Sequence, residues 1–192
     1  TIRLYEFLEE NNIREKLQEK LHNLEIEEEL KYSNDYIASY NILIDVLDEK
    51  TGVSIGEIIS KSDAHKKGIW HGSVHLIIIN KDKTKTLFQK RASGKDLYPN
   101  MWDITVGGHI SSGENDLSAV KRELFEELGI NPNNYKIEFI KKYKEELFNN
   151  GIISKEFVSL YILYLDNELE KFELQEDEVD SVCWVTKDEM EL

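Results

Sequence analysis

Three glutamates near the middle of the chain are the residues best suited to chemistry. Glu123, Glu126 and Glu127 follow Arg122 in the stretch RELFEELG, which is typical of the last two turns of a helix. Because successive helical residues turn by roughly 100°, the three carboxylates gather on one face. There they repel one another, and they lie toward the negative end of the helix dipole. The arrangement therefore needs cations, and clustered carboxylate oxygens are ligands of Mg²⁺ or Mn²⁺.

The alternative is a helix whose acids only face solvent, and in a chain this acidic the helix alone does not exclude it. The flanking glycines favour the metal site. Gly107, Gly108 and Gly113 bracket a short loop that leads into Glu114. Closely approaching backbone and a further carboxylate are therefore expected beside the acidic face.

Other elements must hold these residues in place. An apolar stripe on the helix is expected to face the core, and Gly129 is expected to cap the helix. The stripe consists of Leu117, Val120, Leu124 and Leu128. Short β-branched runs predict strands in 41–59, a hairpin over 74–91 with its turn at 80–85, strands at 135–142, 157–165 and 179–185, and a helix that starts at Lys187.

Residues 1–40 differ in composition from the rest of the chain. They are rich in Glu, Lys, Leu and Asn, contain no Gly or Pro, and repeat apolar residues at roughly helical spacing. The sequence thus predicts a helical N-terminal arm, followed by one domain at 41–192. The arm could join two copies into a homodimer or fold back on its own domain, and the sequence leaves both open.

The stretch from Gly108 to Ile130 resembles the Nudix box, in which G, five residues, E and seven residues precede R-E-apolar-x-E-E-x-G-apolar. All fixed positions match: Gly108, Glu114, Arg122, Glu123, Leu124, Glu126, Glu127, Gly129 and Ile130. The resemblance implies an α/β fold, namely an α/β/α sandwich with a mixed β-sheet. It also implies a metal-dependent hydrolase that cleaves a diphosphate linkage with Mg²⁺ or Mn²⁺.

Residue roles follow from the same resemblance. The implied metal ligands are Glu123, Glu126, Glu127 and the carbonyl of Gly107, while Arg122 would orient the glutamates and Glu114 would brace the loop. Water activated by the metal ions would attack a phosphorus atom. A carboxylate outside the box would act as base, and the candidates are Glu156, Glu176 and Glu178. We assign catalysis to Glu126, Glu127, Arg122 and Glu156, the last as one of these three candidates.

Three segments outside the box resemble the Nudix branch that contains type 1 isopentenyl-diphosphate isomerase. They are AHKKGIWH (64–71), QKRASGKDLYPNMWD (89–103) and VGGH (106–109). This likeness implies metal-binding roles for His65, His71, His109 and Glu156, and diphosphate contacts for Arg91 and Lys95. For His65 and His71 ordinary packing is the favoured interpretation, and for His109 both interpretations stay open. For Arg91 and Lys95 a substrate contact is favoured over a solvated turn.

One replacement separates the chain from the isomerase. The catalytic cysteine of that enzyme corresponds to Gly107, whereas the box, which is degraded in the isomerase, is intact here. We therefore expect a hydrolase that acts on a small-molecule diphosphate, such as a nucleoside di- or triphosphate or a nucleoside diphosphate linked to another group. The alternatives are a nucleotide sensor without catalysis and, last, an isomerase-like activity.

The composition limits the partners further. With 38 acidic and 24 basic residues the net charge is −14, which disfavours nucleic acid and anionic lipid. Without a long apolar run or a secretory signal, we expect no membrane partner and a cytoplasmic location. The lone Cys183, in the apolar run VCWV, excludes an intrachain disulfide and is expected in the core. Trp70, Trp102 and Tyr98 are expected in the core or at a pocket wall.

Overall fold

A computed structural model describes residues 42–149, 151–165 and 171–190. The predicted arm at 1–40 lies outside the described residues, so its helical character and its part in a homodimer stay predictions. The described elements follow in chain order: β1 (Leu43–Leu47), β2 (Ser54–Ser60), α4 (Lys61–Lys67), β3 (Trp70–Asn80), β4 (Lys85–Arg91), β5 (Trp102–Asp103), β6 (Val106–His109), α5 (Asp116–Leu128), the 3₁₀ turn η1 (Pro132–Asn134), β7 (Glu138–Asn149), β8 (Ile152–Leu165), β9 (Val179–Thr186) and α6 (Lys187–Met190).

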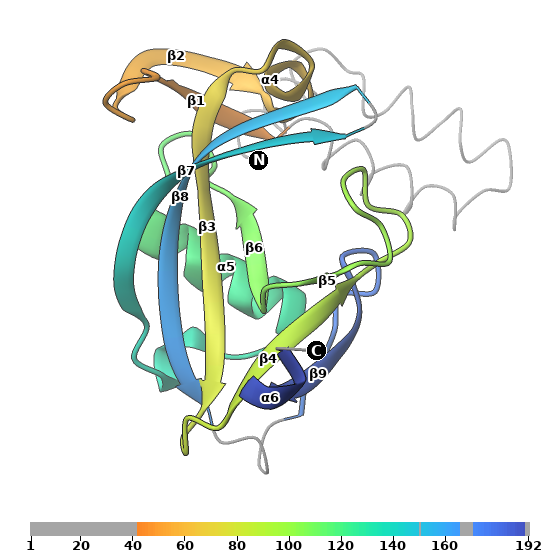
Figure 1. The fold of residues 1–192 in the computed structure, drawn as a ribbon. Helices are drawn as coiled ribbons and strands as arrows, with labels where there is room; N and C mark the ends of the chain where they lie inside the picture. The colour runs from red at the N-terminus through yellow and green to blue at the C-terminus, as the bar shows by residue number, and fades with distance from the viewer. Residues whose placement is uncertain (1–41, 150, 166–170, 191–192) are drawn as a thin grey trace, which may run out of the picture.

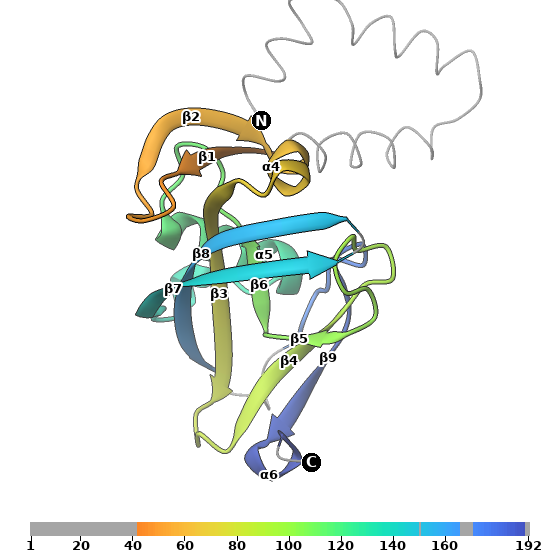
Figure 2. The same ribbon diagram turned by 45° about the horizontal axis from the view of Figure 1, so that its top comes forward.

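A mixed sheet of seven strands is built around the long strand β3 (Figure 1). β3 runs parallel to β8 and antiparallel to β4 and β6, while β7 pairs with β8 and both β5 and β9 pair with β4. β1 and β2 form a separate hairpin, which lies with α4 near the N-terminal end of β3 (Figures 1 and 2). The α/β class and the mixed sheet predicted from the sequence are confirmed.

The two faces of β3 differ in chemistry because side chains alternate along a strand. Val74, Leu76 and Ile78 are fully buried and join the core with Val120, Leu124 and Leu128 of α5. The opposite face of β3 carries His71 and His75 instead. The sheet thus has an apolar side, covered by α5, and a polar side.

Helix α5 has a cap at each end, and the one at Gly129 was predicted from the sequence. The Asn115 side chain accepts a hydrogen bond from the Ser118 N–H, and Gly129 ends the helix with a left-handed φ of 69°. The expected apolar stripe is correct for Val120, Leu124 and Leu128. It is wrong for Leu117, which is 43% exposed because it lies in the first turn, beyond the edge of the sheet contact.

The predicted strands are all present, with shifted bounds. The 74–91 hairpin is confirmed by the pairing of Ile78 with Leu87. The strand expected at 157–165 begins at Ile152, and that expected at 135–142 runs from Glu138 to Asn149. The first residues of β8 were not predicted as strand, because buried polar residues such as Ser154 and Glu156 interrupt the apolar pattern there.

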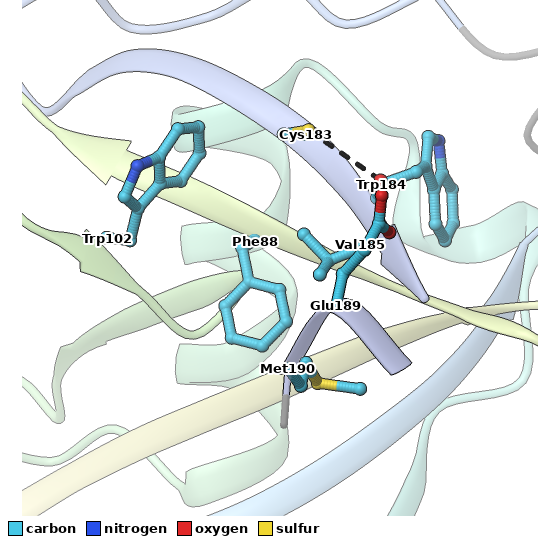
Figure 3. Close-up of a pocket in the computed structure, with 7 residues that line it drawn as sticks. All are labelled: Phe88, Trp102, Cys183, Trp184, Val185, Glu189 and Met190. Atoms are coloured by element: carbon cyan, nitrogen blue, oxygen red, sulfur yellow. Dashed lines mark hydrogen bonds between the residues drawn. The ribbon is translucent and has the colours of Figure 1, made fainter. Parts of the chain in front are cut away.

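Cys183 is exposed, so its predicted place in the core is wrong. Together with Trp102 it lines an apolar groove on β4, β9 and α6 (Figure 3). The partner of Cys183 in the β4–β9 ladder is Phe88, which lines the same groove. Trp70 is buried as expected, whereas Tyr98 is 39% exposed. No helix in the described part of the chain is long and apolar enough to cross a membrane.

Candidate active site and metal centre

Arg122 is the centre of the acidic site. Its Nε and Nη2 donate to the two carboxylate oxygens of Glu114 at 3.1 and 3.0 Å. Its Nη1 donates to Glu123 at 2.6 Å and to Glu126 at 3.0 Å, and Nη2 also reaches the His109 carbonyl at 3.0 Å. These bonds raise the pKa of Arg122 against the effect of burial. The planar guanidinium therefore links α5 both to the loop that carries Glu114 and to the backbone of β6.

Glu123 and Glu127 are the buried acids of the box. Burial raises the pKa of Glu123 to about 7, although Arg122 opposes the shift. Glu127 is 4% exposed, and burial, followed by the charges of Glu123 and Glu178, raises its pKa well above the ordinary value. Its carboxylate accepts a hydrogen bond from the Gln89 amide at 3.3 Å. Buried carboxylates that repel one another are suited to a divalent cation with a preference for oxygen ligands, so the donor set fits Mg²⁺ or Mn²⁺.

Glycines of β6 allow the acids to approach the sheet. A Cβ at Gly108 would lie 2.1 Å from the Glu123 carboxyl group, so the strand can touch this side chain only without one. The Gly107 backbone hydrogen-bonds to Glu127. On the other face of β6, a Cβ at Gly107 would lie 3.4 Å from the His75 ring. The short strand thus separates the box acids from a group of histidines.

That group contains the four residues named from the isomerase likeness. One nitrogen or oxygen from each of His65, His71, His109 and Glu156 lies within 4.8 Å of the others. Nε2 of His65 is 3.2 Å from Nε2 of His109, and the latter is 3.6 Å from Glu156 Oε1. These side chains come from α4, β3, β6 and β8. The interpretation of His65 and His71 as ordinary packing histidines stays a prediction, and the structure places both beside His109 and Glu156.

The histidines have the protonation that metal ligands require. Burial lowers the pKa of His65 to about 4, and it also lowers those of His71 and His109. His71 Nδ1 donates to the Ile69 carbonyl at 2.8 Å, which leaves a lone pair on Nε2. This buried Nε2 has no hydrogen-bond partner and lies 3.9 Å from Glu156. Neutral imidazoles and one carboxylate are a fitting ligand set for a first-row transition metal ion.

Lysines from two segments stand close to both groups. Burial, then the charge of Lys95, lowers the pKa of Lys61, while Glu178 and Glu123 act in the opposite direction. Lys61 in turn lowers the pKa of His109. Lys95 contacts Glu178. Arg91 is held by the Leu97 carbonyl at 2.9 Å and by Asp103 at 3.0 Å. An anionic group can therefore meet Lys61 and Lys95 between the acids and the histidines.

The three candidate bases lie in different surroundings. Glu178 is half-buried, and its charge raises the pKa of both Glu123 and Glu127. Glu156 belongs to the histidine group. Burial would raise its pKa, but the neighbouring His71 and the hydrogen bond from the Ser154 hydroxyl lower it. Glu176 is exposed in the turn before β9.

Sequence reasoning missed several residues of the site. Lys61 lies one helical turn before His65, a spacing that places both on one face of α4. His75 follows His71 by four residues, which puts both on one face of a strand. Tyr143 and Glu145 alternate in the same way on β7. These spacings were visible, but their convergence depends on strand pairing between distant segments.

Comparison with known proteins gives a consistent result. The NUDIX domain family matches residues 70–192. An uncharacterized Nudix hydrolase of Clostridium acetobutylicum is 38% identical over 149 residues, which are 77% of this chain and 71% of that protein. An isopentenyl-diphosphate Delta-isomerase of Pectobacterium atrosepticum is 31% identical over 149 residues, which are 78% of this chain and 77% of that enzyme.

The fold also has a relative among solved structures. A crystal structure of a Deinococcus radiodurans protein superposes with a TM-score of 0.62, covering 77% of this chain and 85% of the other. At 20% identity this likeness supports the fold alone.

Proposed function

Because this chain belongs to the Nudix family and is a hydrolase of that family, we propose that it cleaves the diphosphate linkage of a small phosphorylated substrate. The substrate class is a nucleoside di- or triphosphate, or a nucleoside diphosphate linked to another group. The observation that supports this proposal is the arrangement of Glu123, Glu126 and Glu127 around Arg122, with Lys61 and Lys95 beside them.

Glu123, Glu126, Glu127 and the Gly107 carbonyl would hold Mg²⁺ or Mn²⁺. When bound, such ions activate water and neutralise the charge that develops on the phosphate oxygens. Lys61 and Lys95 bind the diphosphate, because they are cations, besides Arg122, whose charges act on the box acids in a chain of net charge −14. Arg91, which precedes Lys95 in the same segment, would contribute to the same anion site. Arg122 positions the acids.

The base removes a proton from the attacking water. Glu178 is better placed for this than Glu156, since its charge acts on both buried box acids, while Glu156 is engaged by Ser154 and lies near His71 and His109. Replacing Glu178 with Gln should lower kcat. If Glu156→Gln has that effect and Glu178→Gln does not, Glu156 is the base.

The central test is Glu127→Gln, which keeps the size of the side chain and removes its charge. Phosphate and pyrophosphate release is measured on a panel of nucleotides, dinucleotides, coenzyme diphosphates and isoprenoid diphosphates, with Mg²⁺, Mn²⁺ or chelator. We expect metal-dependent turnover by the wild type and a loss of more than about 100-fold in the variant, because a direct ligand matters more than its partners. Glu138→Gln, on an exposed strand end, is the control. Binding without turnover across the panel would support the sensor instead.

A second candidate is an isomerase-like activity, which the histidine group favours. We propose that His65, His71, His109 and Glu156 hold a transition metal ion. The reacting thiol that the isomerase uses has no counterpart at Gly107, and Cys183 lies on the face of β9 opposite to that of Gln89 and Glu127. We therefore expect no conversion of isopentenyl diphosphate to its allylic isomer. Conversion at an enzymatic rate would instead establish the isomerase.

A further inference from the structure

A second group of possible metal ligands lies beyond the histidine group, on the same polar side of the sheet. It consists of His75 on β3, Glu145 on β7 and Glu156 on β8, and one ligand atom from each lies within 4.8 Å of the others. β8 lies between the other two strands and pairs with both (Figures 1 and 2). Glu156 is thus the one residue that belongs to both groups.

The two glutamates face each other directly. Glu145 and Glu156 are partners in the antiparallel β7–β8 ladder, where side chains of opposite residues point to the same face. Like charges in this position are destabilising. Burial and the charges of Glu156 and Asp103 all raise the pKa of Glu145. While both carboxylates are ionised the pair is therefore unfavourable, and a proton or a cation between them would relieve the repulsion.

The lysines adjacent in sequence to Glu145 and Glu156 are directed elsewhere, whereas Nζ of Lys141 lies over the Tyr143 ring at 5.4 Å. Nζ of Lys144 lies over the Trp70 ring at 4.7 Å, and Nζ of Lys155 lies over the same ring at 5.6 Å. Lys155 also pairs with Glu146 at 3.4 Å. Since side chains alternate along β7, Lys144 and Glu146 point away from the face that carries Glu145.

His75 is oriented as a ligand would be. The Tyr143 hydroxyl and His75 Nδ1 are 2.9 Å apart, and Tyr143 stands two residues before Glu145 on the same face of β7. A metal-binding histidine commonly has its second ring nitrogen fixed in this way. Burial lowers the pKa of His75 and raises that of Tyr143 to about 12, so both groups are neutral near pH 7. Gly107, opposite His75 in the β3–β6 ladder, leaves the ring uncovered on that side.

We propose that His75, Glu145 and Glu156 bind a divalent first-row transition metal ion, separate from the ions of the acidic box. One imidazole and two carboxylates suit ions between hard and soft, such as Mn²⁺, Fe²⁺, Co²⁺ or Zn²⁺. Small side-chain rotations would bring the three atoms to the usual distance of about 2.1 Å from an ion. Tyr143 is the positioning residue. The site does not depend on the hydrolysis proposed above.

The test uses Co²⁺ as the probe, with the full chain in excess Mg²⁺. Mg²⁺ occupies the oxygen-only box, whereas nitrogen-containing sites prefer Co²⁺. Bound Co²⁺ is counted by equilibrium dialysis and elemental analysis for the wild type, Glu145→Gln and Glu146→Gln. The last is a matched control, because it changes the adjacent glutamate, which faces Lys155. Thermal unfolding shows whether each variant is folded.

We expect Glu145→Gln to bind about one Co²⁺ fewer per chain than the wild type, and Glu146→Gln to bind the same number as the wild type. His75→Gln should match Glu145→Gln, and Tyr143→Phe should weaken the same ion by about 10- to 100-fold. Equal Co²⁺ number and affinity in Glu145→Gln and the wild type would overturn the proposal. This experiment counts bound ions, whereas the hydrolase assignment is tested by measuring activity. The failure of one proposal can therefore be told apart from the failure of the other.

Discussion

At the scale of single residues, the site depends on positions where a side chain is absent as much as on those that react. Gly108 allows Glu123 to lie against β6, and Gly107 leaves room beside His75. Arg122 then fixes the acids through a planar group that lysine cannot imitate. The arrangement is therefore sensitive to changes that add a single carbon atom.

Gly108→Ala tests this sensitivity. The new Cβ would meet the Glu123 carboxyl group at 2.1 Å, so this proposed metal ligand would have to move. We expect kcat to fall by at least about tenfold and the Mg²⁺ concentration for half-maximal activity to rise. Gly94→Ala, whose Cβ would meet no atom within 4 Å, should leave both unchanged. Normal Mg²⁺ dependence in Gly108→Ala would show that Glu123 is not a ligand.

The raised pKa values of the acids predict a pH dependence. Without metal, protonated Glu123 stabilises the fold below its ordinary pKa of 4.5, and this stability is lost as the pH rises through about 7. Mg²⁺ must displace the same protons. We therefore expect Mg²⁺ to raise the melting temperature little at about pH 5.5 and strongly at about pH 8. A calorimetric series in which the Mg²⁺ effect is the same at both pH values would contradict this prediction.

The box residues were predictable because their relation is local. Glu123, Glu126 and Glu127 share a helical face by spacing alone, so one helix was enough to bring them together. The partners of Glu156 were not predictable in this way. They come from α4, β3 and β6, and only the parallel pairing of β3 with β8 brings His71 opposite Glu156. Sequence spacing contains no information on that register.

At the scale of elements, α5 must begin and end at fixed residues so that its acids meet β6. The Asn115 cap and the left-handed Gly129 define these ends. The hairpin of β3 and β4 was predicted because its turn is rich in Asn, Asp and Lys. The full length of β8 was not, because its first half alternates toward a polar site rather than a core. Leu117 and Cys183 were misplaced because an apolar residue in a helix or strand can remain exposed, Leu117 in the first turn of α5 and Cys183 on the face of β9 that lines the apolar groove.

Substitutions at the two ends of α5 should destabilise the domain. Asn115→Ala removes the hydrogen bond to the Ser118 N–H, which costs about 1 kcal/mol in the free energy of unfolding. Gly129→Ala should cost about 1 kcal/mol or more, because φ is 69° and the new Cβ would lie 2.7 Å from Cβ of Glu173. Urea unfolding measures both. Ser118→Ala keeps the backbone donor and serves as control, and a loss there as large as in Asn115→Ala would argue against the cap.

At the scale of the whole molecule, a strongly acidic chain gathers buried and partly buried basic groups around one site. Lys61, Lys95 and three histidines surround acids on both sides of β6. Because the net charge of the chain is −14, these cations favour the approach of an anionic substrate at this place. Because these histidines lie close together and burial lowers their pKa values, the stability of the metal-free protein depends on their staying neutral.

Without metal, the stability of the protein should therefore decrease as the pH falls. The pKa of His65 falls from 6.5 to about 4 on folding, so its contribution to stability is present above pH 6.5 and is lost as the pH falls through about 4. In chelator, the melting temperature of the wild type should fall more steeply between about pH 7 and pH 4.5 than that of His65→Gln. Parallel curves for the two proteins would show that His65 titrates normally.

Strand β6 is only four residues long, yet it has a different site on each side. Inserting one residue just before Gly107 would rotate everything after it by half a turn of the strand, so that His109 would point toward α5 and a glycine would replace it among the histidines. Both sites would be lost together. An insertion between Ser111 and Asn115 would leave this frame intact, but it would change the spacing that lets Glu114 bond to Arg122 and to the Ser111 N–H. Length changes should therefore be tolerated neither within β6 nor in the loop that joins it to α5.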